Sequence, residues 1–357
     1  MEGMTVDKMK YNPLFYDPRP TWSYNAIYNE VLGGRGTGKT FNVLGWAIER
    51  WIKSRYTDKP SGIVYLRRYK TELEMLTKDP NKGTAQLFDD LMDKGMFAGH
   101  ELKAEHDVLY CDGEIMGIAL ALTNSSILKS IPFPHARVGI FEEFTTSDRF
   151  RGYLPHEVEV FLDIDSTIDR NRDQLRWFML GNMVDTVTPY MTYWEHDLPY
   201  MKKRELYGND NQILVELVKN EEFVDGVKKT RRGQLLAGTN YGKYAYDNEP
   251  LRGNADFIKK KSFSSEYKFT LTYFDKKIGV WFDPRDGVYY ISNDVNEEYG
   301  LTYAATTSDM RPNLLLFKKS SRSPFIQRLM TAYECGCVFY EDKKLKHMFL
   351  EIAKIGR

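Results

Sequence analysis

The first 180 residues alternate between short apolar runs and segments whose apolar residues recur at helical spacing. Residues 41–55 show helical spacing, and Pro155 opens a second helical segment that continues to about Ile168. The runs typical of buried strands are residues 27–32, 62–66, 137–141 and 176–180. Because strands separated by helices favour a mostly parallel sheet, this region is predicted to be an α/β domain.

The pattern changes after about residue 190. Residues 190–227 are charged and helical in character, which suits a linker or lid. Beyond Gly233, alternating strands are expected at 268–273, 278–282 and 288–291, followed by helices at about 323–334 and 342–355. We therefore predict an α/β domain over residues 1–197, a helical linker or lid over 198–230 and an α+β domain over 231–357.

A glycine-rich loop joins the first predicted strand to the first predicted helix. It follows the spacing Gly-x-x-x-x-Gly-Lys-Thr through Gly33, Gly34, Arg35, Gly36, Thr37, Gly38, Lys39 and Thr40. In such a P-loop the backbone N–H groups point at phosphates, the lysine reaches the β- and γ-phosphates, and the threonine hydroxyl binds Mg²⁺. The loop predicts a nucleoside triphosphate ligand, and ATP is favoured because the chain has no Asn-Lys-x-Asp element for guanine.

Two adjacent acids follow the apolar strand at 137–141. Glu142 is placed to face the metal ion and Glu143 to polarise the attacking water, although two solvated acids at a strand end are the plainer alternative. Glu142 is one methylene longer than the usual Asp, so contact with the metal through water is expected. Asn182 follows the next strand, either as a sensor of the γ-phosphate or as an ordinary turn residue.

The net charge of the whole chain does not indicate a nucleic-acid partner, but the distribution of charge suggests candidate binding residues. Lys plus Arg and Asp plus Glu both number 50, yet residues 1–230 carry a net charge of −6 and residues 231–357 carry +6, so the C-terminal domain is a candidate polyanion-binding element. Arg170 and Arg172 could reach a neighbouring subunit's nucleotide, or could lie on a solvated face. Three cysteines are too few for a disulfide framework or a four-ligand zinc site, which favours a reducing compartment.

Several motifs taken in order resemble the encapsidation ATPases of small tailed phages of the phi29-like group. They are Val31–Thr40, Tyr65–Lys70, Phe141–Phe144, Arg170–Arg172, Gly238–Gly242 and Gly279–Trp281. The resemblance covers nearly the whole chain. It implies a ring-shaped, pentameric motor that uses ATP and Mg²⁺ to drive double-stranded DNA through a portal into a procapsid in the host cytoplasm, with a packaging RNA as a further partner.

The resemblance also implies residue roles and a fold. Lys39 and Thr40 would bind nucleotide and Mg²⁺, Glu143 would be the catalytic glutamate of an additional-strand ATPase, and Arg170 would act in trans on the neighbouring site. Further implied roles are trans communication for Lys129, with Arg172 as a second candidate, and DNA contact for Lys70. The C-terminal domain would be RNase H-like but without nuclease activity, since residues 269–273 contain no acid. Where the family has Asp before the catalytic Glu, this chain has Glu142.

Two other functions remain open from the sequence. A P-loop kinase or phosphotransferase would need a closed acceptor pocket, and DNA would leave its turnover unchanged. A nucleotide-switched RNA-binding assembly factor would bind RNA strongly and hydrolyse ATP negligibly.

Overall fold

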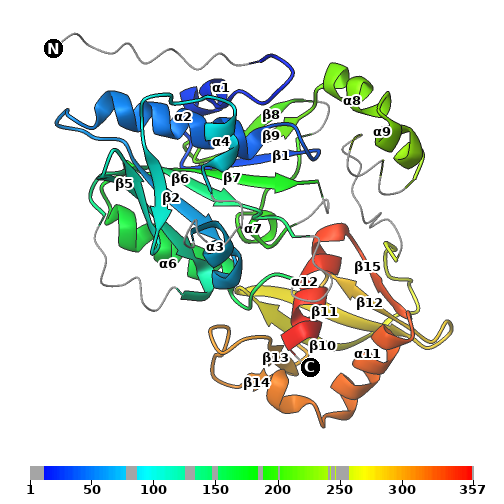
Figure 1. Cartoon of the computed structure of the whole chain (residues 1–357). Coiled ribbons are helices and arrows are strands. Elements are labelled where there is room, and N and C mark those ends of the chain that lie inside the picture. Colours follow the sequence, from blue (N-terminus) through cyan, green and yellow to red (C-terminus); the bar gives the residue numbers. More distant parts are fainter. Residues whose placement is uncertain are drawn as a thin grey trace. The chain divides into compact units, whose positions relative to one another are not determined.

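A computed structural model describes residues 12–77, 87–124, 133–146, 152–183, 188–199, 202–239, 242, 246 and 257–355. The chain forms two compact units (Figure 1). The first unit contains residues 1–184 and 198–251, and the second contains residues 185–197 and 252–357. Each unit has its own sheet and its own hydrophobic core.

The first unit is built on a nine-stranded sheet in the order β3-β4-β5-β2-β6-β7-β1-β9-β8. The six central strands, β5-β2-β6-β7-β1-β9, are parallel to one another. The edge strands β3 and β4 on one side and β8 on the other pair antiparallel. Their bounds are β1 Tyr28–Gly33, β2 Gly62–Arg67, β3 Leu102–Glu105, β4 Val108–Cys111, β5 Glu114–Ala121, β6 Ala136–Glu142, β7 Arg176–Asn182, β8 Arg204–Tyr207 and β9 Ile213–Val218. An extra strand, β7, lies between β1 and β6, so the expected additional-strand arrangement is confirmed.

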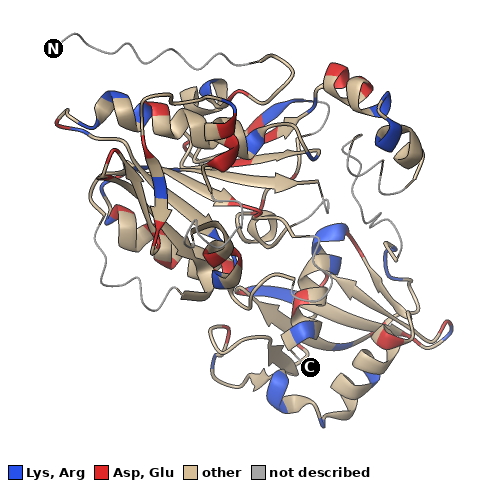
Figure 2. Cartoon of the chain, in the orientation of Figure 1, with Lys and Arg blue, Asp and Glu red and all other residues tan. Residues whose placement is uncertain are grey.

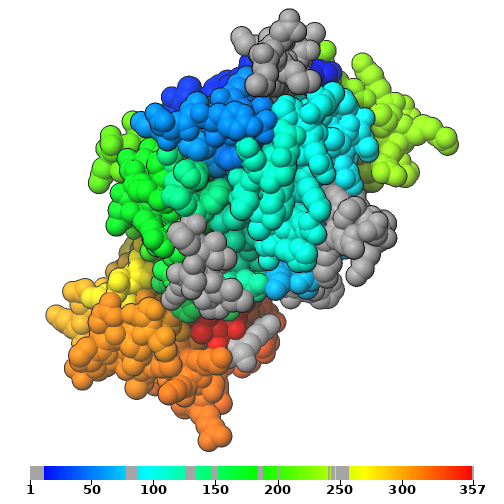
Figure 3. Space-filling model, turned by 60° about the vertical axis from the view of Figure 1, so that its left-hand side comes forward, coloured from blue at the N-terminus to red at the C-terminus, as the bar shows by residue number. Residues whose placement is uncertain are grey.

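Helices cover both faces of this sheet. Trp177 and Phe178 are neighbours on β7 and point to opposite faces, as successive strand residues must. Phe178 belongs to the core under α2, where it contacts Trp46, while Trp177 packs against Phe161 of α6. The helices of this unit are α1 Pro18–Ser23, α2 Lys39–Ser54, α3 Lys70–Thr77, α4 Asp89–Asp93, α6 Glu157–Asp169, α8 Glu221–Lys228 and α9 Arg231–Leu236, with a 3-10 turn η2 at Leu122–Asn124. In Figure 3, α2 lies beside the segment that carries α4.

The helical linker expected over residues 198–230 is wrong in most of its length. Strands β8 and β9 fill residues 204–207 and 213–218 and extend the main sheet, and helix begins only at Glu221. This stretch is charged, yet the side chain of Glu216 on β9 is fully buried and pairs with Arg204 at 2.7 Å. The charged residue Glu216 therefore belongs to a short buried strand, where its charge is compensated by Arg204.

The second unit is an α+β domain with a six-stranded sheet in the order β14-β13-β10-β11-β12-β15. An antiparallel meander, β10–β11–β12, is continued at β10 by two parallel strands, which is the strand arrangement of RNase H-like folds. Its elements are α7 Pro189–Tyr193, β10 Glu266–Tyr273, β11 Lys276–Asp283, β12 Val288–Ser292, β13 Thr302–Ala304, β14 Leu315–Leu316, η3 Lys318–Ser320, α11 Pro324–Glu334, β15 Val338–Tyr340 and α12 Lys343–Ile355. The predicted fold class is confirmed.

Charged side chains of the second unit are spread over η3, α11, α12 and the strands (Figure 2). The expected polyanion-binding role of this basic domain therefore stays a prediction. Among the described helices, none is long and apolar enough to cross a membrane.

Candidate active site

The glycine-rich loop lies at the carboxyl end of β1, where Gly33 ends the strand and Lys39 begins α2. Gly36 and Gly38 have φ angles of +77° and +75°, a left-handed backbone that favours glycine. The loop is also held from outside, because the backbone N–H of Tyr16 donates to the carbonyl oxygen of Thr37 at 2.9 Å. The local sequence therefore produces the strand, loop and helix that a P-loop requires.

Lys39 is buried inside this loop. Its Nζ donates to the carbonyl oxygens of Gly33 at 3.1 Å and Gly34 at 2.8 Å, and to the Thr37 hydroxyl at 3.2 Å. Burial lowers the pKa of Lys39 to about 8, and the negative charge of Glu142 opposes that shift. The ammonium is thus held by loop oxygens within reach of the position that phosphates occupy in P-loops.

The lowered pKa of Lys39 leads to a pH prediction. A bound triphosphate favours charged Lys39 and raises its pKa, so between the two pKa values binding must take up a proton and affinity must fall as pH rises. Calorimetry at about pH 9 in two buffers of different ionisation enthalpy should detect this uptake, and at about pH 6.5 it should be absent. Lys53→Ala, which removes an exposed lysine of the same helix, should behave like wild type. Equal heats in both buffers at pH 9 would contradict the prediction.

The two acids take different positions at the end of β6. Glu142 is the last strand residue and accepts a hydrogen bond from the Tyr65 hydroxyl, whereas Glu143 follows with a φ of +56° and is more exposed. Arg67 bridges them, since its Nη1 lies 3.4 Å from an oxygen of each carboxylate. A left-handed backbone is uncommon for glutamate, so the surrounding structure must hold Glu143 in place.

Arg68 supplies that support from the end of β2. Its guanidinium donates to the carbonyl oxygens of Glu143 at 2.8 Å and Phe144 at 2.6 Å. The same guanidinium pairs at 2.7 Å with Glu157 of α6, and both side chains are buried. The backbone of the acidic turn is therefore fixed by a buried ion pair that the sequence did not reveal.

One cavity of about 1340 Å³ in the first unit gathers the predicted residues. It is lined by Arg35, Gly36, Thr37, Gly38, Lys39, Thr40, Glu142, Glu143 and Asn182, while Gly33 and Gly34 hold Lys39 through their carbonyl oxygens. The parallel register of β1 and β7 sets Gly33 opposite Asn182, which is why Asn182 reaches the loop. The hydroxyl of Thr40 and the carboxylate of Glu142 thus share a cavity, and hard oxygen donors of this kind suit Mg²⁺.

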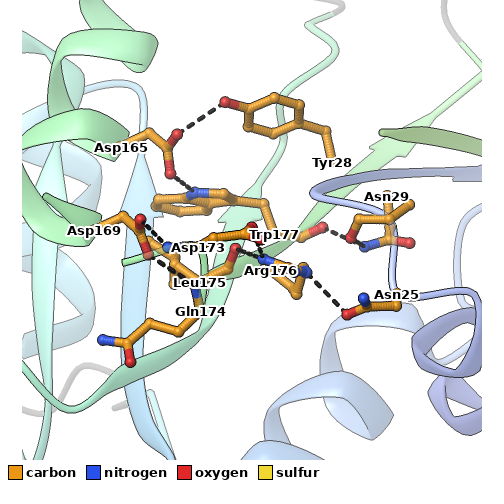
Figure 4. A network of polar contacts seen from close by, with 11 residues as sticks. Asn25, Tyr28, Asn29, Asp165, Asp169, Asp173, Gln174, Leu175, Arg176 and Trp177 are labelled. Carbon is orange, nitrogen blue, oxygen red and sulfur yellow. Dashed lines mark hydrogen bonds and ion pairs between the residues drawn. The ribbon is translucent and has the colours of Figure 1, made fainter. Parts of the chain in front are cut away.

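Arg170 and Arg172 lie after α6 and do not line this cavity. The Asp169 carboxylate accepts hydrogen bonds from the backbone N–H groups of the turn that follows them: Asp173 at 2.8 Å, Gln174 at 3.0 Å and Leu175 at 3.1 Å (Figure 4). The Arg172 guanidinium folds back onto carbonyl oxygens of Ile168 and Asp169, whereas Arg170 is exposed at a φ of +49°. The two arginines therefore differ in geometry, since the guanidinium of Arg172 is bonded to the end of α6 and Arg170 is exposed.

Lys70 does not line the cavity. Lys70 begins α3 with a half-exposed side chain, 3.9 Å from Glu74. Lys129 lies outside the described residues.

Comparison with known proteins agrees with this fold. The DNA packaging protein of Bacillus phage phi29 is 30% identical over 341 residues, covering 96% of this chain and 97% of the relative. The solved structure of the bacteriophage Phi-29 viral genome packaging motor assembly is 29% identical and matches with a TM-score of 0.69, covering 96% of this chain and 100% of that one. The N-terminal domain of the phi29 DNA packaging ATPase is 30% identical with a TM-score of 0.51, covering 59% of this chain and 99% of the domain.

A family profile extends the match to nearly every residue. The profile of the Podovirus DNA encapsidation protein (Gp16) covers residues 9–355, and the expected resemblance is thereby confirmed. The chain belongs to the Podovirus DNA encapsidation protein (Gp16) family.

Proposed function

We propose that this protein hydrolyses ATP to drive double-stranded DNA through a portal into a procapsid. The observation that carries the proposal is one cavity in which Lys39, Thr40, Glu142 and Glu143 meet, in a chain of the encapsidation family. The rival kinase and RNA-switch functions lose support, because the relatives are named DNA packaging proteins.

The residues of the cavity divide the chemistry between them. Lys39 and the loop N–H groups bind the phosphates, and Thr40 with Glu142 would hold Mg²⁺, which neutralises charge on the phosphates when bound. Glu143 orients the attacking water with its exposed carboxylate. In the described geometry Arg67 Nη1 lies 3.4 Å from one oxygen of each acid, and we expect Glu143 to leave this ion pair before hydrolysis.

ATP hydrolysis could be coupled to DNA binding through the short segment that joins β2 to α3. Arg67 ends β2, and Lys70 begins α3 three residues later. A phosphate of DNA bound at Lys70 would displace the segment that positions Arg67, and so would change the ion pair between Arg67 and Glu143. Lys129 and Arg172 stay candidates for communication between subunits.

Assembly completes the proposed motor. Arg170 caps the end of α6, just before the turn that Asp169 holds, and lies outside its own cavity, which fits a residue that acts on a neighbouring subunit in a ring. The ring is proposed to be pentameric and to contact the portal and a packaging RNA on the procapsid.

Duplex DNA should stimulate ATP turnover if this proposal is right. The experiment measures phosphate release by the full chain with procapsids, with and without double-stranded DNA, and Lys39→Ala reports contaminating activity. A several-fold increase with DNA is expected. Equal turnover with and without DNA would favour a small-molecule phosphotransferase instead.

A further inference from the structure

Two phenylalanine rings lie against the P-loop. Phe15 precedes α1 and Phe223 lies on α8, and their ring centroids are 5.7 Å apart. Both touch loop glycines: a Cβ added to Gly38 would lie 3.0 Å from Cβ of Phe15, and one added to Gly36 would lie 3.3 Å from Cζ of Phe223. Single exposed apolar residues are ordinary on protein surfaces. Two rings that meet each other beside a phosphate loop call for an explanation.

Phe15 is the fixed member of the pair. The adjacent Tyr16 donates its backbone N–H to Thr37 in the loop at 2.9 Å, and its carbonyl oxygen accepts from Asn42 of α2 at 2.6 Å. The Phe15 side chain lines the nucleotide cavity and remains 38% exposed. The chain thus ties an aromatic face to the loop and leaves that face accessible.

Phe223 is the movable member. Helix α8 has no buried residue, so little packing holds it down. Asn220 caps the helix by accepting the Phe223 N–H at 3.0 Å, and its amide donates to the Pro13 carbonyl oxygen at 3.0 Å. Through Asn220 and the ring contact, α8 is attached to the same N-terminal segment that carries Phe15.

We propose that Phe15 and Phe223 form the subsite for the base of the bound nucleotide. The base stacks on the fixed ring of Phe15, and α8 brings Phe223 over it as a lid. Phosphates held by residues 33–40 leave the base just outside the loop, and aromatic rings bind the π-face of any base by stacking. The inference rests on nucleotide binding at the P-loop, which is one part of the proposed function.

The test separates the base from the phosphates. Calorimetry on the full chain compares ATP with inorganic tripolyphosphate, which has no base. Phe15→Ala and Phe223→Ala should each weaken ATP binding by about 5- to 100-fold and leave tripolyphosphate binding unchanged. Phe325→Ala removes a phenylalanine of equal exposure, 38%, from the second unit and should change neither affinity.

Each other outcome has a distinct meaning. Unchanged ATP affinity in both variants overturns the base subsite, and so does an equal loss for ATP and tripolyphosphate, which would mean that the rings only support the loop. Phe15→Trp, which keeps a stacking face, should retain ATP affinity and guards against misfolding of the alanine variants. Failure of wild-type protein to bind ATP would count against the proposed function itself.

Discussion

Mixing Glu143→Gln subunits with Arg170→Ala subunits is expected to restore ATP turnover that neither variant has alone. Glutamine keeps the shape of Glu143 but cannot accept a proton from water, and loss of a general base typically costs about 10²- to 10⁴-fold. An arginine supplied in trans typically contributes about 10³- to 10⁵-fold. Both single variants should therefore be nearly inactive, as homogeneous assemblies, while still binding ATP.

Recovery follows from where Arg170 lies. Arg170 does not line the cavity of its own subunit, and the proposal is that each active centre takes Glu143 from one subunit and Arg170 from the next. In a mixed assembly, some interfaces pair the wild-type Glu143 of an Arg170→Ala subunit with the wild-type Arg170 of a Glu143→Gln subunit. Phosphate release measured across mixing ratios should peak at intermediate ratios, where such interfaces are most numerous.

Arg172→Ala provides the matched control for this experiment. Arg172 has the same charge two residues away, but its guanidinium is bonded to the carbonyl oxygens that end α6. Replacing it should leave most of the turnover intact and should not be needed for recovery in mixtures. If no mixture of the first two variants recovers activity, Arg170 does not act in trans.

Sequence predicts the phosphate loop and the acids because each is local. The strand, loop and helix of residues 28–54 are continuous, and Glu142 directly follows an apolar strand. The helical linker predicted over residues 198–230 is wrong at β9 because the contacts there are not local. Glu216 is buried and accepts a hydrogen bond from Thr21, which lies 195 residues earlier in the chain.

The supporting residues of the site cannot be predicted in this way. Arg67 and Arg68 look alike in sequence, yet the first reaches the carboxylates and the second holds the backbone of the same turn. Their roles depend on partners 75 to 89 residues away, which only the fold brings near. The fold also brings Phe15 and Phe223 together, although no sequence spacing links the two residues.

Replacing Glu157 with glutamine is expected to lower the free energy of unfolding of the first unit by about 3–5 kcal/mol. Breaking a buried ion pair by removing one charge leaves the other buried without compensation, and such losses usually fall in this range. Here the stranded group is Arg68, whose side chain is 4% exposed and whose partner is 1% exposed. Glutamine preserves the volume of the side chain, so the loss reports charge rather than a cavity. Urea denaturation followed by circular dichroism measures it.

Glu159→Gln is the control, because Glu159 lies one half-turn away on α6 with a partly exposed side chain beside His156. It should change the unfolding free energy by less than about 0.5 kcal/mol. Since Arg68 also fixes the carbonyl oxygens of Glu143 and Phe144, folded Glu157→Gln protein should bind ATP but turn it over more slowly. Wild-type stability and turnover in Glu157→Gln would show that backbone carbonyl oxygens alone hold Arg68, and that the buried pair does not position the catalytic turn.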